Sequence, residues 1–285
     1  VNMKVYIETL GCQMNKSDSE KIIGILENCG YVETTNPEEA DLLIINTCSI
    51  RAASENKAYS YLGVWGKWKR SNPDIKIAMC GCVAQQTGEK ILKRAPYIDL
   101  IFGTHNIEEL PVLIKRLNTE EKVCSILKKQ YENPYESVIP KRKEGISAWL
   151  PIIEGCDYFC TYCVVPYTRG RQRSRNPEDI IKEAKEIVKQ GYKEITLLGQ
   201  TVDSYGRDFK DKNYYLCDLL RDLNDINGLL RLRFVTSYPT EITDDLIQAV
   251  KELDKVCEYF HIPMQSGNTE VLDKMRRRYS RENYI

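Results

Sequence analysis

The sequence predicts an α/β protein with two parallel-sheet domains in series. Short apolar runs alternate with amphipathic helical patterns up to about residue 130, and the same alternation begins again near residue 146. Strands that alternate with helices along a chain predict parallel sheets. The 285 residues, of which 42% are hydrophobic, suffice for one large domain or two ordinary ones.

The first domain is predicted over residues 1–130. Its three strand candidates are residues 4–10, 42–46 and 75–79. Ser17 and Glu20 have the spacing of a capping box that begins a helix, and Gly30 suits the position just after that helix. A second helical pattern begins at about Ala52. This order of elements predicts consecutive βαβ units in one parallel sheet.

Residues 131–145 mix proline, tyrosine and charged residues without periodicity, which predicts an extended linker. The second domain is expected over residues 146–285, as part of a TIM-like parallel βα barrel with its catalytic loops after the strands. Its strand candidates are residues 148–154, 194–198, 230–236 and 259–263. Asn176 and Pro177 begin one helix, and Thr243 caps another.

Charge and cysteine content narrow the class of protein. Basic and acidic residues both number 41, so no net field draws the chain to nucleic acid or membrane. A local run of four arginines would contact phosphates or form a solvated face: Arg276, Arg277, Arg278 and Arg281. No apolar run is long enough to span a bilayer. Eleven cysteines without a recognisable signal peptide favour a reducing cytoplasm and metal-bound thiolates over disulfides.

Cys156, Cys160 and Cys163 follow a predicted strand, with three and two residues between them. Thiolates are the usual ligands of iron–sulfur clusters, and three of them leave one iron of a cubane cluster open. An open position distinguishes a catalytic metal from a structural one. A zinc knuckle is the alternative, but it requires a fourth local ligand, and His105 and His261 are distant in sequence.

Cys12, Cys48 and Cys82 each follow a strand of the first domain. The carboxyl ends of parallel strands share an edge where ligands bind, so these thiols are expected to form a second cluster site. Cys80 competes with Cys82 for the third position. The alternative is that they are ordinary buried cysteines, which pack as small hydrophobes. We interpret the remaining cysteines in that way: Cys29, Cys124, Cys217 and Cys257.

These motifs resemble the radical S-adenosylmethionine methylthiotransferases over nearly the whole chain. The matching segments are residues 9–15, 18–20, 46–51, 81–85, 155–163, 165–171, 174–175, 196–200 and 264–267. Gln13-Met14-Asn15 followed by Asp18-Ser19-Glu20 is most similar to the MiaB-type branch of the family. The sequence departs from the family pattern at three positions. Thr201 and Asp203 stand where asparagine is common, and Tyr238 stands where histidine is expected.

The resemblance implies two [4Fe-4S] clusters. Cys12, Cys48 and Cys82 would hold an auxiliary cluster, and Cys156, Cys160 and Cys163 the radical cluster. Two S-adenosylmethionine molecules would serve them: one methylates a sulfur on the auxiliary cluster, and the other yields a 5′-deoxyadenosyl radical. The radical would remove hydrogen from C2 of N6-isopentenyl-adenosine beside the anticodon of tRNA.

The resemblance also implies partners. These are the tRNA anticodon stem-loop, an electron donor such as flavodoxin or ferredoxin, and a sulfur donor, with no membrane and a cytoplasmic location. Family members continue through the end of the barrel into a small C-terminal β-domain that grips tRNA, so we expect this chain to be truncated. Two other classes stay open: the same chemistry on a ribosomal protein side chain, and a metal-stabilised RNA-binding module without catalysis.

Six more residues are expected in the pocket for S-adenosylmethionine or substrate: Tyr162, Arg169, Arg171, Gln200, Ser237 and Gln265. Tyr162 would pack near the cofactor's adenine, or serve as a core aromatic. Four arginines alternate along an extended run and would bind phosphate or the cofactor carboxylate on one side, or form a solvated edge: Arg169, Arg171, Arg173 and Arg175.

Overall fold

The computed structural model describes residues 3–49, 52–127, 140–143 and 145–285, which form two compact units. Unit 1 comprises Val1–Lys143 and Tyr167–Arg169, and unit 2 comprises Glu144–Pro166 and Gly170–Ile285. Most of the predicted linker, residues 131–139 and 144, lies outside the described residues. In the part of the chain that is described, no helix has both the length and the apolar character needed to cross a membrane.

Unit 1 is built on a six-stranded parallel sheet with the order β2-β1-β3-β4-β5-β6. The strands are β1 (Met3–Leu10), β2 (Tyr31–Glu33), β3 (Leu42–Thr47), β4 (Lys76–Gly81), β5 (Leu100–Phe102) and β6 (Val123–Ser125). The three strands predicted in this unit are confirmed to within two residues at each end. The predicted α/β class is therefore confirmed.

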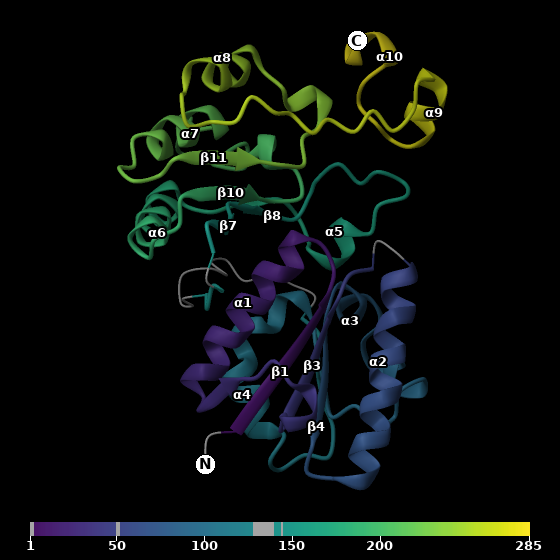
Figure 1. Cartoon of the computed structure of the whole chain (residues 1–285). Helices are drawn as coiled ribbons and strands as arrows, with labels where there is room; N and C mark the ends of the chain where they lie inside the picture. Colours follow the sequence, from purple (N-terminus) through teal and green to yellow (C-terminus); the bar gives the residue numbers. More distant parts are fainter. Residues whose placement is uncertain (1–2, 50–51, 128–139, 144) are drawn as a thin grey trace. The chain divides into compact units, whose positions relative to one another are not determined.

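Helices cover both faces of this sheet (Figure 1). Helices α1 (Gln13–Asn28) and α4 (Leu110–Arg116) lie on one face, and α2 (Ala52–Ser71) and α3 (Cys82–Thr87) on the other. Successive residues of β3 alternate between the two layers, because Leu42 and Ile44 pack with α1 whereas Leu43 and Ile45 pack with α2. Short 3-10 helices complete the unit: η1 (Pro37–Glu39), η2 (Gly88–Lys93) and η3 (Thr104–Glu109).

The predicted capping box at Ser17 is wrong. Helix α1 begins at Gln13 with Cys12 as its N-cap, and Ser17 is a buried residue inside the helix. The Cys12 backbone N–H donates to the Asn15 side-chain oxygen over 3.3 Å. Asn15 thus takes the place that the box assigned to Glu20, five residues earlier in the sequence. Gly30, at a φ of 88°, does end the helix as predicted.

Unit 2 contains a three-stranded parallel sheet, β11-β10-β7, and an antiparallel pair, β8-β9. The strands are β7 (Ser147–Pro151), β8 (Ile153–Glu154), β9 (Arg173–Ser174), β10 (Glu194–Leu198) and β11 (Arg231–Phe234). The helices are α6 (Pro177–Lys189), η4 (Val202–Ser204), α7 (Leu216–Asn224), η5 (Pro239–Glu241), α8 (Asp244–Glu252), α9 (Thr269–Lys274) and α10 (Arg281–Tyr284), and α5 (Val165–Thr168) is divided between the two units. The described residues form an open sheet and no closed barrel.

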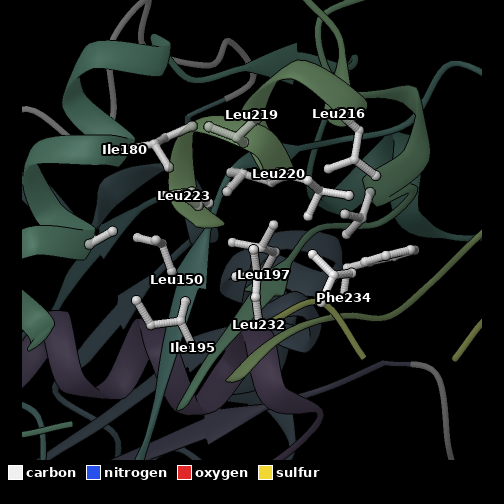
Figure 2. Packing of buried hydrophobic residues seen from close by; sticks show 14 of the residues in the cluster. Leu150, Ile180, Ile195, Leu197, Leu216, Leu219, Leu220, Leu223, Leu232 and Phe234 are labelled. Atoms are coloured by element: carbon white, nitrogen blue, oxygen red, sulfur yellow. The ribbon is translucent and has the colours of Figure 1, made fainter. Parts of the chain in front are cut away.

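One apolar cluster joins the sheet of unit 2 to its helices. Figure 2 shows side chains from strands β7, β10 and β11 facing those of helices α6 and α7. Leu150, Leu197 and Leu220 in this cluster are all fully buried. The predicted starts of two helices are confirmed, because Asn176 is the N-cap of α6 and the Thr243 hydroxyl accepts the Leu246 N–H in α8.

The predicted strand at residues 259–263 is wrong. The contacts with β11 lie just before this segment. Val256 forms an isolated parallel bridge with Leu232, and the Cys257 N–H donates to the Leu232 carbonyl over 2.9 Å. The next backbone bond, from Ser237 N–H to His261 O, is 3.1 Å long. Because no ladder connects these contacts, the sheet ends at β11.

Substitution of Gly81 by alanine is expected to destabilise unit 1. Gly81 has a φ of 89°, and a Cβ there would lie 2.4 Å from both the Thr47 carbonyl oxygen and the Asn46 side-chain oxygen. A strained backbone conformation of this kind costs about 1–3 kcal/mol, and the clash adds to it. The free energy of unfolding, obtained from urea titration followed by circular dichroism, should fall accordingly.

Gly63 provides the matched control. It lies inside helix α2, and a Cβ there would have no neighbour within 4 Å. Gly63→Ala should therefore raise the free energy of unfolding by about 0.5–1 kcal/mol. An equal response of the two variants would contradict the backbone argument.

Candidate functional site

The first cysteine triad, Cys12, Cys48 and Cys82, lies at the carboxyl edge of the unit 1 sheet. Cys12 follows β1 by two residues, and Cys48 and Cys82 directly follow β3 and β4. The Cys48 N–H donates to the Leu10 carbonyl over 3.0 Å. The strand β2 is added on one side of β1, and β3 and the later strands are added on the other side. The boundary between β1 and β3 is therefore a topological switch point, where open α/β sheets bind ligands.

The three thiols form one group. The Cys48 side chain is hydrogen-bonded to both Cys12 and Cys82. This contact is the largest cause that lowers the pKa of Cys12 and of Cys82, against the effect of their burial. Because thiolates are the form that ligates metals, the environment favours the form of these two residues that a cluster would require.

Cys80 and Cys82 have different surroundings. Cys80 is 1% exposed and packs in the apolar cluster with Leu100 and Phe102. Burial raises the pKa of the Cys80 thiol well above its ordinary value. Of the two competitors, Cys82 is therefore the one beside Cys48.

A buried arginine adjoins this triad. The Arg169 guanidinium makes two bonds to the Asp18 carboxylate, of 3.2 and 2.5 Å, and both side chains are almost fully buried. Arg169 also hydrogen-bonds to Cys82, which further lowers the pKa of that thiol. The Thr168 carbonyl accepts the Thr104 hydroxyl, and Tyr167–Arg169 accordingly belong to unit 1.

Two buried asparagines connect the ends of β1 and β3. The Asn15 amide donates to the Asn46 side-chain oxygen over 3.1 Å, and the Asn46 amide donates to the Asn15 carbonyl over 2.9 Å. These bonds fix the first turn of α1, and with it Cys12, relative to Cys48. Our sequence analysis assigned neither asparagine a role. Their position three residues after Cys12 and two before Cys48 was the available signal.

The second triad occupies the loop after β8. Gly155 precedes it with a φ of 79°, and a Cβ there would lie 2.0 Å from the Arg171 carbonyl oxygen. The Gly155 N–H donates to the Gln200 side-chain oxygen over 2.6 Å, and Cys156 N–H to the Gly170 carbonyl over 3.1 Å. The predicted residue Gln200 thus holds the backbone of the cysteine loop.

Cys156, Cys160 and Cys163 pack in one cluster with Tyr158 and Tyr238. Burial raises the pKa of Cys156 and of Cys163. The Cys156 sulfur lies 3.6 Å from the Thr201 hydroxyl, and the Cys160 sulfur accepts a 3.4 Å bond from Arg277 Nη1. Sequence reasoning missed Arg277, and its place in a run of arginines gave no sign of this contact.

No three His, Cys, Asp or Glu side chains within the described residues are arranged to hold a metal ion. Cubane clusters differ from single-ion sites because each thiolate binds a different iron. The two sets of three thiols fit that donor pattern, since one set gathers at the ends of three neighbouring strands and the other lies in a single loop.

The other predicted site residues have varied surroundings. Tyr162 is 52% exposed, so it is not a core aromatic. Arg171 pairs with Asp157 at 2.8 Å. Ser237 is buried, and its hydroxyl has no hydrogen-bond partner among the residues that the structure describes. Gln265 is exposed and has a φ of 66°.

The alternating arginines do not form one solvated edge. Arg169 belongs to unit 1 and the others to unit 2. Arg173 bonds Glu154 at 3.2 Å, and Arg175 bonds Glu183 at 2.7 Å. Each arginine of the run has its own carboxylate.

The remaining cysteines are less deeply placed than predicted. Cys217 is buried, whereas Cys29, Cys124 and Cys257 are only partly buried. None of the eleven cysteines forms a disulfide.

Comparisons with known proteins divide the chain in two. Residues 4–103 match the uncharacterized protein family UPF0004, and residues 150–285 match the radical SAM superfamily. Two solved structures of the radical S-adenosylmethionine methyltransferase TsrM from Kitasatospora setae share the fold. One, with cobalamin and a [4Fe-4S] cluster bound, has a TM-score of 0.64 at 14% identity and covers 99% of this chain and 66% of that one. The other, with tryptophan and a SAM analog, has a TM-score of 0.66 at 13% identity, covering 99% and 64%.

Curated relatives match the chain from end to end. The tRNA-2-methylthio-N(6)-dimethylallyladenosine synthase of Desulforamulus reducens is 47% identical over 287 residues, covering 100% of this chain and 63% of that protein. The synthase of the same name from Clostridium botulinum is 50% identical, covering 98% and 62%. The chain thus spans less than two thirds of the length of these relatives. The chain is thus similar along its length to these synthases, and it carries a UPF0004 match followed by a radical SAM match.

Proposed function

We propose that this chain contains the cluster-binding part of a tRNA methylthiotransferase. The reaction would place a methylthio group on C2 of N6-isopentenyl-adenosine next to the anticodon. The observation that carries the proposal is the grouping of Cys12, Cys48 and Cys82 at the switch point of unit 1. A chain with the second triad alone would suit many radical enzymes, whereas two triads suit a reaction that needs both a radical and a sulfur donor.

Cys12, Cys48 and Cys82 would hold an auxiliary [4Fe-4S] cluster, and Cys156, Cys160 and Cys163 the radical cluster. When bound, the clusters and S-adenosylmethionine supply the electron, the methyl group and the sulfur chemistry. The protein contributes positioned thiols, a dry environment and charge. Thiols must lose their protons to bind iron, and the contacts of Cys48 and Arg169 lower that cost at the first triad.

The surrounding residues divide by what they contact. Arg169 and Gln200 act on the triads themselves, through Cys82 and the Gly155 backbone. Tyr162, Arg171, Ser237 and Gln265 remain proposed contacts of S-adenosylmethionine or substrate. The exposed ring of Tyr162, next to Cys163, is available to stack on a base or an adenine.

The partners follow from the chemistry. The target base would be presented single-stranded or everted from its loop, because C2 of a stacked adenine is not accessible to an enzyme. A low-potential electron donor such as flavodoxin or ferredoxin and a donor of sulfur would complete the system. Eleven cysteines without a disulfide suit a reducing cytoplasm.

Iron content tests the two sites. After anaerobic reconstitution, the chain should contain about eight irons, and the triple variant Cys156→Ala, Cys160→Ala, Cys163→Ala about four. The same count is expected for Cys12→Ala, Cys48→Ala, Cys82→Ala. Iron and acid-labile sulfide assays measure this directly. Zinc in place of iron, or loss of all iron on removal of one triad, would refute two independent clusters.

The pair Cys82 and Cys80 offers a sharper comparison. Cys82→Ala should lower the iron content toward that of the triple variant, because it removes one of three ligands. Cys80→Ala should retain about eight irons, since this thiol lies in the apolar core. A reversed result would move the third ligand to Cys80.

The substrate is tested in cells. Nucleoside analysis of digested tRNA should find the 2-methylthio form of isopentenyl-adenosine in the parent strain and only the unmodified form after deletion of the gene. Restoration by the intact gene but not by its Cys82→Ala version connects the product to the first triad. Unchanged tRNA, with loss of a methylthio group from a ribosomal protein, would favour the protein-directed branch.

Reductive cleavage of S-adenosylmethionine separates an enzyme from an RNA-binding module. The dithionite-reduced, reconstituted chain should form 5′-deoxyadenosine, quantified by liquid chromatography. The radical-triad variant should form at least tenfold less. If the parent protein with about eight irons forms none, the chain lacks radical catalysis by itself.

A further inference from the structure

The run of arginines near the C-terminus contains one member unlike the rest. Arg277 is only 9% exposed, whereas Arg276, Arg278 and Arg281 are exposed. A phosphate-binding face or a solvated face would place its arginines in contact with water. The role of Arg277 must therefore be sought inside unit 2.

The Arg277 guanidinium contacts the second triad. Its Nη1 donates to the Cys160 sulfur over 3.4 Å, and its Nε donates to the Tyr279 hydroxyl over 3.2 Å. Its Nη2 is buried and has no hydrogen-bond partner within the described part of the chain. Cys160 is itself 8% exposed. A full positive charge is thus held against a thiol away from water.

Aromatic rings fix this charge. The guanidinium carbon lies 4.1 Å from the centroid of the Tyr238 ring, within the range of a cation–π contact. Tyr238 in turn stacks on Tyr158, with centroids 3.7 Å apart and an interplanar angle of 8°. The Tyr158 hydroxyl donates to Glu241. Tyr238 stands where the family pattern leads us to expect histidine, and its ring supports the guanidinium by this stack.

The two triads differ in how their arginine is neutralised. Arg169 beside the first triad is bound by the Asp18 carboxylate. No carboxylate forms an ion pair with Arg277 among the residues described. In a site of low dielectric, an unpaired charge acts strongly on its neighbours. The nearest group that gains negative charge on cluster binding is the Cys160 sulfur.

We propose that Arg277 is a positioning residue that raises the reduction potential of the cluster on Cys156, Cys160 and Cys163. One-electron reduction by an external low-potential donor adds a negative charge to the cluster. Hydrogen bonds to the ligand sulfurs and nearby charge set the potential of such clusters. The Arg277 charge stabilises the reduced form, and so allows a weaker donor to reduce it. The inference rests on the proposed function only in that this triad binds a [4Fe-4S] cluster.

The test is a redox titration of the reconstituted full chain, followed by electron paramagnetic resonance. It is repeated with Cys12, Cys48 and Cys82 changed to alanine, so that one cluster remains. Arg277→Gln should shift the midpoint potential to a more negative value and lower the ratio of reduced to oxidised cluster at a fixed potential about tenfold, equivalent to about 59 mV for one electron. Arg277→Lys keeps the charge without the planar fork and should shift the potential less.

Arg276→Gln is the matched control, because it removes the same charge from an exposed neighbour. Its potential should equal that of the parent. An unchanged potential in Arg277→Gln, with about four irons retained, would overturn the inference and leave the proposed function intact. Absence of iron from the parent triad would instead refute the proposed function. If Arg277→Gln fails to hold iron, the neutral variant Arg277→Met decides: a more negative potential supports the inference, and the parent value overturns it.

Discussion

The parallel pairing of β1 with β3 is the constraint on which the first site depends. Its register sets Leu10 opposite Thr47, so the two chains leave the sheet at the same edge and at the same level. Cys12 and Cys48 follow within two residues, and β4 adds Cys82 in the same way. A shift of one residue in that register would turn every side chain of the strand to the other face. The buried asparagine pair, Asn15 and Asn46, fixes it at the edge itself.

The two triads have different electrostatic surroundings although their thiol number is the same. At the first triad the arginine charge is balanced by Asp18 and the thiols contact one another. At the second triad the Arg277 guanidinium lies against the Tyr238 ring and has no carboxylate partner among the described residues. An excess positive charge beside the second triad suits a cluster that accepts an electron. The proposed division of labour is thus consistent with the local charges.

Local pattern and residue type were enough to predict much of this molecule. Buried parallel strands are continuous apolar runs, and a cysteine after each run is visible without a structure. The predicted start of α1 was wrong because Asn15, and not Glu20, completes the cap. The strand at 259–263 was wrong because a strand needs a partner along its length, which sequence alone does not reveal. The contacts of Arg169 and Arg277 could not be predicted from the sequence, since the Asp18 carboxylate and the Tyr238 ring that receive them are distant along the chain.

The assignment of Tyr167–Arg169 to unit 1 has a consequence for how the protein can be divided. A fragment that stops after Lys143 would keep Asp18 inside the unit but lose the Arg169 guanidinium bonded to it. Breaking a buried pair in this way costs about 3–5 kcal/mol, a large part of the stability of an ordinary domain. The amino-terminal half is thus expected to lose stability when it is separated from three residues that are synthesised after the second set of cysteines.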